Sequence, residues 1–335
     1  MTEVPLAVVI IVVTTAAIWL GSEWLEEASA RLATHYELPP VVQGGIIAAA
    51  GSSFPELASV VFAALAGSFD LGVGAIVGSA IFNVLVIPAL AVLLSEGGVE
   101  STRTLVHKET LFYLTAVMVL FLVFALALIY NPTEATLSGR LTRPLVVAPL
   151  LVYVLYLFLQ WQDTVDYTPE PETNDIQVLR QWAFLLGGLV LILVAVERLV
   201  DSVLVLGEAA GVSDFLLGVV IVAAATSLPD TLVSVQAANE QRYVASIANV
   251  VGSNTFDLLV VIPVGVLLTG TATINFGVAA PMMACLVGAT ILLFVTLRTQ
   301  LVLTTRETWP LMLAYSAFVA WAVLEALAVV NLLPK

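Results

Sequence analysis

Acidic residues inside apolar stretches are the feature of this sequence that most strongly suggests chemistry. Glu56, Asp230 and Asp257 each lie well within a run of apolar residues. A carboxylate in an apolar medium is costly unless a cation or a proton compensates its charge. In membrane segments such acids usually mark an ion pathway. The three acids therefore predict a site that binds cations.

Hydroxyl and amide side chains accompany these acids at helical spacing. Ser52 and Ser53 precede Glu56 by four and three residues, which would place them on one face of a helix. Similar spacings recur in three further sets: Thr226 and Ser227 with Asp230, Ser79 with Asn83, and Ser253 with Asp257. Carboxylate, amide and hydroxyl oxygens are the ligands that hard cations such as Ca²⁺ prefer.

Two prolines add main-chain oxygens to this chemistry. Pro55 and Pro229 lack the N–H that would bond the carbonyl four residues earlier, so they are expected to free the carbonyls of Gly51 and Ala225. Such carbonyls are tolerated inside a membrane where they line a cavity or bind an ion. A glycine precedes the serine in each second motif, at Gly78 and Gly252, and predicts close helix contacts there.

The motifs form an internal repeat. SSFPE (52–56) and VGSAIFN (77–83) recur as TSLPD (226–230) and VGSNTFD (251–257), and the offset is 174 residues in both cases (226 − 52 and 251 − 77). A proline kink or a Gly-Ser pair on its own is more often a packing feature. Packing, however, does not require an acid at the same place in both copies, so the repeat favours an ion site.

The elements that position these residues are predicted to be membrane helices. The chain is 60% hydrophobic and 11% charged, with a mean hydropathy of +1.06, whereas soluble domains are about a quarter charged. Apolar runs long enough to cross a bilayer, about 20 residues each, occur near 5–25, 40–66, 72–94, 110–130, 144–161, 181–206, 215–238, 244–269, 275–297 and 309–331. The fold class predicted is an all-α membrane protein with ten transmembrane helices.

The ten spans divide into two units. Residues 1–161 hold the first five spans, 162–179 form an acidic linker that we interpret as a solvated hinge, and 180–335 hold the last five. Because each unit has an odd number of spans, the second must cross the membrane in the opposite sense to the first. Such inverted repeats are typical of secondary transporters, with the site near the midplane between the repeats.

Charge sets the expected orientation and partners. A formal net charge of −14 disfavours nucleic acids as partners. Ten spans place both termini on one side, and the positive-inside rule puts that side outside. Inside loops would then hold Arg31, Arg103, Lys108, Arg180, Arg242, Arg298 and Arg306, against Arg140, Arg143 and Lys335 outside.

The paired motifs resemble the two alpha repeats of the calcium/cation antiporter superfamily, in particular its sodium/calcium exchanger branch. The resemblance covers nearly the whole chain and implies alternating access, with the first and sixth helices sliding over the site. It implies that Glu56 and Asp230 are the principal Ca²⁺ ligands. It also implies that the cation sites are completed by Ser52, Ser53, Thr226, Ser227, Ser79, Ser253, Asn83 and Asp257, with the main-chain carbonyls of Ala49 and Ala223.

Departures from the family pattern bear on the transported ions. Ser52 stands where threonine is frequent, and Asp230 where many prokaryotic members have glutamate. Asp257 and the VGSAIFN motif also resemble the K⁺-dependent branch, which leaves K⁺ transport open. Proton/calcium members usually carry a glutamate in the third and eighth helices, and this chain has Asn83 and Asp257 there, which favours Na⁺ as the driving ion.

The function predicted is exchange of Na⁺ for Ca²⁺ across the cell membrane, without enzymatic activity or a cofactor. The expected partners are inorganic cations and the lipid bilayer, and no protein partner is expected to be obligatory. The alternatives are an antiporter of H⁺ and Ca²⁺ or of another divalent cation, and a cation channel. An intramembrane aspartyl protease using Asp230 and Asp257 is disfavoured because neither residue lies in a GxGD motif.

Charged residues with no assigned role are Glu23, Glu26, Glu27, Glu197, Asp201 and Glu325. Those in the first and sixth spans form either an ion entry path or a patch at the helix ends.

Overall fold

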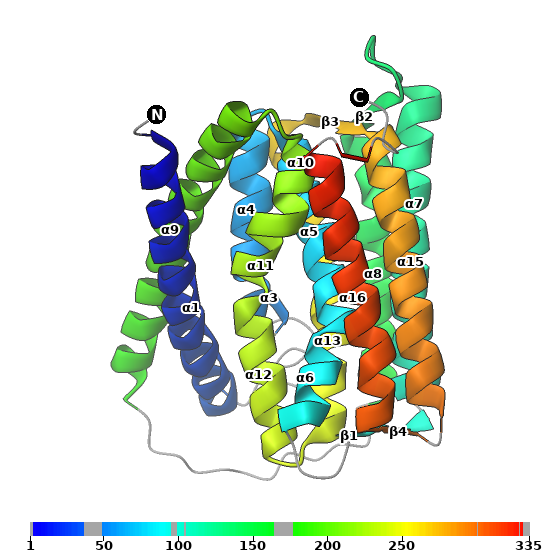
Figure 1. Ribbon diagram of the computed structural model, residues 1–335. Helices are drawn as coiled ribbons and strands as arrows, with labels where there is room; N and C mark the ends of the chain where they lie inside the picture. The colour runs from blue at the N-terminus through cyan, green and yellow to red at the C-terminus, as the bar shows by residue number, and fades with distance from the viewer. Residues whose placement is uncertain are drawn as a thin grey trace.

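The computed structural model is almost entirely helical over the residues that it describes (Figure 1). These are residues 3–36, 49–94, 99–103, 105–163, 177–299, 301–327 and 329–330. The first half contains α1 (Glu3–His35), α3 (Ala49–Ser52), α4 (Phe54–Leu65), α5 (Phe69–Leu85), α6 (Ile87–Leu94), β1 (Val99–Glu100), the π-helical segment η2 (Leu105–Glu109), α7 (Thr110–Tyr130), β2 (Ser138–Thr142) and α8 (Arg143–Asp163).

The second half follows a similar order of helices and strands, but its π-helical segments fall at different places. It contains α9 (Val178–Ala210), α10 (Asp214–Leu217), the π-helical segment η3 (Gly218–Val222), α11 (Ala223–Thr226), α12 (Leu228–Asn239), α13 (Tyr243–Phe256), the π-helical segment η4 (Asp257–Val261), α14 (Ile262–Thr269), β3 (Thr271–Asn275), α15 (Phe276–Arg298), β4 (Val302–Leu303) and α16 (Thr305–Ala326).

Seven helical segments of the described residues are long and apolar enough to cross a membrane. They consist of α1, α5 with α6, η2 with α7, α8, α13 through α14, α15 and α16. An eighth is added if the segments α10–α11 and α12, which are bent by 45°, count as one broken span. The predicted second span falls partly on residues 40–48, which lie outside the described residues, and α4 alone has only 12 residues. Ten spans therefore stay a prediction.

Helix boundaries recur at the offset of the sequence repeat. The short helix α3 and the following α4 correspond to α11 and α12, and each of the four helix ends is shifted by 174 residues. The long helices α1 and α9 lie side by side and run in opposite directions (Figure 1). They touch where Gly21 meets Gly188, because a Cβ on Gly188 would lie 2.5 Å from the carbonyl oxygen of Gly21.

Two short antiparallel strand pairs join the halves at opposite ends of the molecule (Figure 1). Strand β1 follows the third helical segment of the first half and pairs with β4, between the last two helices of the second half. Strand β3 has the place of β1 in the second half, and it pairs with β2, between the last two helices of the first half. In each pair, the strand after the third helical segment of one half thus binds the strand between the last two helices of the other half.

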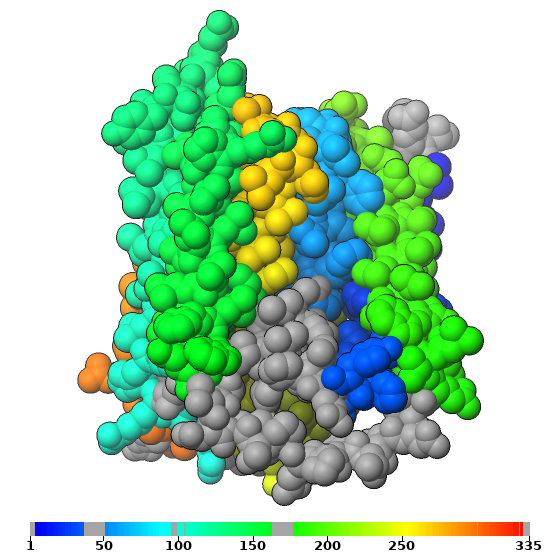
Figure 2. Space-filling model, turned by 180° about the vertical axis from the view of Figure 1, so that it is seen from behind, coloured from blue at the N-terminus to red at the C-terminus, as the bar shows by residue number. Residues whose placement is uncertain are grey.

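The motif helices α5 and α13 lie at the centre of the bundle, where most of their residues are buried. Gly78 permits close contact, because a Cβ there would lie 2.5 Å from the carbonyl oxygen of Val219. The expectation of a matching contact at Gly252 is wrong, since the nearest atom to a Cβ there is 4.0 Å away. On the opposite side of the molecule, α14 and α4 lie next to each other between α8 and α9 (Figure 2).

Candidate cation-binding site

The motifs SSFPE and TSLPD lie where a helix is interrupted. Ser53 separates α3 from α4, and Ser227 separates α11 from α12. The prolines fall in the first turn of α4 and α12, where a missing N–H costs no helical bond. The kinks that the prolines predict are thus present as breaks between two short helices. Ser52 and Glu56 lie on either side of the first break, and both side chains are buried.

The second pair of motifs lies on continuous central helices. Ser79 and Asn83 are on α5, Ser253 is on α13, and Asp257 begins the π-helical segment η4. All four side chains are buried. A π-helical turn inside an α-helix is often found at functional sites, because it shifts the direction of the side chains that follow it.

Side chains from the two halves meet at these motifs. The Asn83 amide donates a hydrogen bond of 2.9 Å to Oδ2 of Asp230, and the Ser227 hydroxyl donates one of 2.8 Å to Ser79 Oγ. Three more hydroxyls lie next to an acid of the other half: Thr226 next to Glu56, Ser53 next to Asp257, and Ser52 next to Asp230. Ser253, of the same half as Asp230, also lies next to that acid. The structure therefore brings together the ten predicted site residues that contribute side chains. Of the two predicted carbonyl ligands, Ala49 is described only as the first residue of α3.

Main-chain oxygens have a more limited place in this arrangement. The carbonyl of Ala223 accepts a hydrogen bond of 3.0 Å from the N–H of Ser227, across the end of α11. A carbonyl oxygen has a second lone pair, so this bond leaves one acceptor position at Ala223. Its role as a cation ligand stays a prediction.

The three carboxylates are close enough to repel one another. Glu56 interacts electrostatically with both Asp257 and Asp230, and the exposed fractions of the three residues are 0%, 1% and 0%. None of them has a Lys or Arg partner in the part of the chain that the structure describes. Because like charges in an apolar interior are strongly unfavourable, this cluster requires compensation by cations or protons.

Many oxygen atoms of the cluster lack a hydrogen-bond donor among the described residues. They are both carboxylate oxygens of Glu56 and of Asp257, Oδ1 of Asp230 and Oδ1 of Asn83. Among the same residues, no three His, Cys, Asp or Glu side chains have the spacing of a compact metal cluster. A cation here would therefore be held by acids together with amide, hydroxyl and carbonyl oxygens, the mixed set of ligands that hard cations such as Ca²⁺ take.

Sequence reasoning missed one polar residue of this cluster, Asn254. Its side chain is fully buried on α13, and its amide oxygen accepts a hydrogen bond of 3.0 Å from the Asn83 amide. The available signal was an asparagine within an apolar run at the place where the first motif has Ala80.

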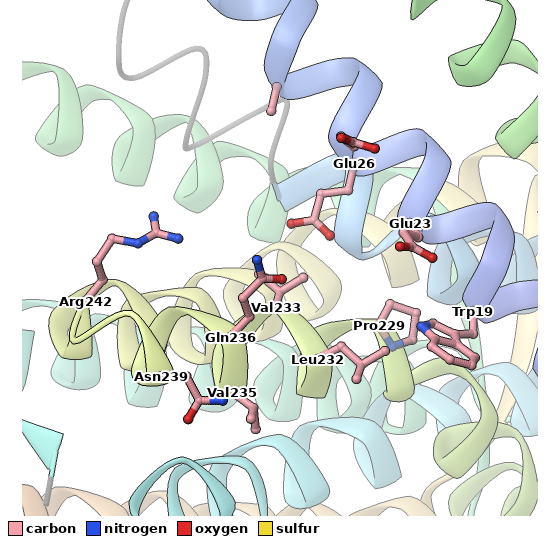
Figure 3. Close-up of a pocket in the computed structure, with 12 residues that line it drawn as sticks. Trp19, Glu23, Glu26, Pro229, Leu232, Val233, Val235, Gln236, Asn239 and Arg242 are labelled. Carbon is pink, nitrogen blue, oxygen red and sulfur yellow. The ribbon is translucent and has the colours of Figure 1, made fainter. Parts of the chain in front are cut away.

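A cavity of about 660 Å³ lies between α1 and α12 (Figure 3). Glu23 and Glu26 face Pro229 and Gln236 across it, and Arg242 lies at its edge. Pro229 precedes Asp230, and Glu26 interacts electrostatically with that acid. The acids of the first span are thus part of a cavity next to the candidate site, which favours the entry-path alternative for them.

The equivalent region between α9 and α4 is packed with apolar side chains. The position that corresponds to Glu26 is Val200, which is 1% exposed, and the position that corresponds to Gln236 is Phe62. Both belong to a cluster that includes Ala58 and Leu199. The acids of the sixth span lie elsewhere: Glu197 is exposed and Asp201 forms a surface ion pair with Arg198 at 4.0 Å.

The apolar helices and the interior cluster of oxygens define a class of protein, a membrane transporter for cations. The family model for sodium/calcium exchanger proteins matches residues 6–162 and 180–324, and the chain belongs to this family. It is therefore a transporter and not an enzyme.

Two relatives and one solved structure illustrate the similarity. The chain is 28% identical over 280 residues to the uncharacterized membrane protein MJ0091 of Methanocaldococcus jannaschii, covering 83% of this chain and 85% of that protein. It is 27% identical over 279 residues to the inner membrane protein YrbG of Escherichia coli, covering 79% and 80%. The solved structure of the sodium-calcium exchanger NCX_Mj soaked with 10 mM Na⁺ and zero Ca²⁺ matches with a TM-score of 0.63 at 25% identity, covering 95% of this chain and 99% of that one.

Proposed function

We propose that the chain is an antiporter of the cell membrane that exchanges Na⁺ for Ca²⁺. The observation that carries this proposal is the cluster of three buried carboxylates, drawn from both halves and without a cationic partner among the described residues. Family membership supports transport, and the oxygen-only chemistry of the cluster supports hard cations as the transported substrates.

Charge balance explains how the two fluxes would be coupled. When ionised, the three carboxylates carry a charge of about −3. Three Na⁺ ions would neutralise it, whereas one Ca²⁺ would leave one negative charge, or none if one acid also binds a proton. The conformational change that moves the site between the two faces is favourable only when the charge is largely compensated, because an uncompensated charge is costly in the apolar interior. Each ion thus shifts the equilibrium through its differential effect on the two states.

In this proposal Glu56 and Asp230 are the principal Ca²⁺ ligands. Asp257, Asn83 and the hydroxyls of the four motifs complete the cation sites, together with the carbonyls of Ala49 and Ala223. The hydrogen bonds that join the halves at Asn83 and Ser79 support this assignment.

The proposed architecture has ten spans in two inverted repeats. The eight candidate spans are completed by α9, which runs along α1, and by the interrupted helix that contains α3 and α4. The exchanged pairing of the four strands at opposite ends of the molecule supports the inversion. The distribution of Lys and Arg supports placing both termini outside.

Alternating access is supported by the unequal packing of the two halves. The cavity beside Glu26 and Pro229 lies toward the end of the molecule opposite the start of α1 (Figures 1 and 3), while the equivalent region of α9 and α4 is packed. In the proposed orientation the structure is therefore open to the inside. Movement of α1 and α9 over the central helices would close one region and open the other.

Flux in reconstituted vesicles tests the proposal. Vesicles that contain the purified protein and are loaded with Na⁺ are diluted into Na⁺-free medium, and we expect uptake of Ca²⁺ that stops when Na⁺ is added outside. Uptake driven by a pH gradient without Na⁺ would instead support exchange with H⁺, and uptake that needs K⁺ inside or outside would add K⁺ as a substrate. Ca²⁺ flux with no dependence on a counter-ion, together with single-channel conductance, would overturn antiport in favour of a channel.

A further inference from the structure

The orientation of the Asn83 side chain is decided by a second asparagine, Asn254. An amide has one oxygen that accepts and one nitrogen that donates, so it offers a cation an oxygen in only one of its two orientations. In the structure, Nδ2 of Asn83 donates to Asp230 and to Oδ1 of Asn254 at 2.9 and 3.0 Å. The Oδ1 atom of Asn83 is left without a hydrogen bond among the described residues.

A backbone carbonyl fixes the orientation of Asn254 in turn. Its Nδ2 atom donates to the carbonyl oxygen of Ala80 at 3.2 Å and to the Tyr113 hydroxyl at 3.3 Å. A carbonyl can only accept, so the nitrogen of Asn254 must face Ala80 and its oxygen must face Asn83. That oxygen also can only accept, which requires the nitrogen of Asn83 on its side. The Ala80 carbonyl therefore determines the orientation of both side-chain amides, those of Asn254 and Asn83.

Asp230 also accepts a hydrogen bond from Asn83, but in the proposed function the strength of this bond changes during transport. In the proposed function Asp230 binds cations or a proton, and its capacity to accept a hydrogen bond from Asn83 changes with each loading step. Asn254 faces the Ala80 backbone and Tyr113, and all its hydrogen bonds are between fully buried groups. The hydrogen bond between Asn254 and Asn83 therefore does not depend on which ion is bound to Asp230.

The two halves differ at the position of Asn254 and at the position of the ligand that it contacts. Position 254 corresponds to Ala80 in the first half, so Asn254 lies against the backbone of its own counterpart. The residue that corresponds to Asn83 is Asp257. A carboxylate has two equivalent oxygens and needs no orientation, whereas an amide does. The second half has an asparagine at 254, whereas the first half has an alanine at the corresponding position 80. The side chain that can orient an amide is therefore present only next to Asn83, where the predicted ligand is an amide.

We propose that Asn254 is a positioning residue that holds Asn83 with its amide oxygen available to the transported cation. The inference rests on the proposed function, because it assigns a cation to the oxygen of Asn83. Residues next to a metal ligand that fix its orientation usually alter metal affinity by about 10- to 100-fold when they are removed.

The test compares asparagines on the same helix. Asn254→Ala is expected to raise the KM for Ca²⁺ at least about tenfold with Vmax within about twofold of wild type. Asn254→Ser keeps a donor for the Ala80 carbonyl but does not reach Asn83, and the same loss is expected with less effect on folding. The matched control is Asn249→Ala, which removes a partly buried amide of α13 that bonds Ser234 at 3.1 Å and should leave KM within about twofold.

A double mutant separates orientation from a merely structural role. With Asn83→Asp the ligand has two equivalent oxygens, so adding Asn254→Ser should not weaken Ca²⁺ binding further. Binding is measured in detergent as the Ca²⁺ concentration that gives half-maximal thermal stabilisation, so transport is not required. An equal loss of affinity in both backgrounds, or an unchanged KM in Asn254→Ser, would overturn the inference. Failure of the proposed function is seen separately, as wild-type vesicles without Na⁺-dependent Ca²⁺ uptake.

Discussion

Asn83 and Asp230 are 147 residues apart in the chain, and their side chains are joined by a buried hydrogen bond of 2.9 Å. One lies in the second motif of the first half and the other in the first motif of the second half. The bond therefore links different motifs of different halves across the centre of the bundle. An N–H that faces Asp230 lowers the cost of its buried charge without adding a positive charge to the cluster.

The buried acids should be indispensable for ion binding. Glu56→Gln and Asp230→Asn keep the shape of each side chain and remove one charge, and we expect Ca²⁺ uptake to fall about 100-fold or more, which corresponds to about 3 kcal/mol of lost binding free energy. The matched control is Glu208→Gln, an exposed acid on α9, which should keep wild-type uptake. Either site variant with normal uptake and normal insertion would remove that acid from the site.

Glycines at equivalent places in the two halves should differ in their tolerance of a methyl group. Gly78→Ala places a Cβ against the carbonyl oxygen of Val219 and is expected to destabilise the protein by about 1–3 kcal/mol. Gly252→Ala meets no atom closer than 4.0 Å and should be neutral or slightly stabilising, since alanine favours the helix. The melting temperatures of the two variants in detergent provide the measurement. Equal loss of stability in both would contradict the close contact at Gly78 and the open space at Gly252.

The unequal packing of the two halves predicts unequal access to reagents. Cys285 is the only cysteine of the chain, so Cys285→Ser gives a background for single cysteines. In that background Glu26→Cys should react with a membrane-impermeant thiol reagent applied from the inner face, and its counterpart Val200→Cys should react slowly from either face. Reaction of Glu26→Cys only from the outer face would reverse the proposed orientation. Equal reaction of both cysteines would contradict the packed state of α9 and α4.

Much of the site could be predicted from the sequence because the repeat constrains it. Acids at corresponding places in apolar runs predicted that Glu56 and Asp230 approach each other, and the structure brings them within electrostatic range. The apolar runs likewise predicted helices at the observed places. Other features depend on partners that are distant in the chain. The orientation of Asn254 depends on its hydrogen bond to the Ala80 carbonyl. The spacing of residues within either motif does not predict that contact.

The cavity could not be predicted from the sequence for a different reason. Corresponding segments of the two halves share the motif spacing, yet among the described residues a cavity lies between α1 and α12 while the region between α9 and α4 is packed. Motif spacing does not report how closely two helices pack. The kink at Pro55 was predicted from the sequence, and the structure has a break there, because proline at the second residue of α4 favours a helix start over a continuation.

The acidic cavity should raise the local concentration of cations before they reach the site. Glu26 lies in the cavity and interacts with Asp230, whereas Glu27 is ion-paired with Arg31 and contributes less uncompensated charge. Glu26→Gln should therefore raise the KM for Ca²⁺ by about two- to fivefold at low ionic strength, and Glu27→Gln should change it less. Because the Debye length is about 10 Å at 0.1 M salt and about 3 Å at 1 M, the difference between Glu26→Gln and wild type should shrink when choline chloride is added. A KM increase that persists at high salt would instead make Glu26 a direct ligand, since short-range coordination is not screened.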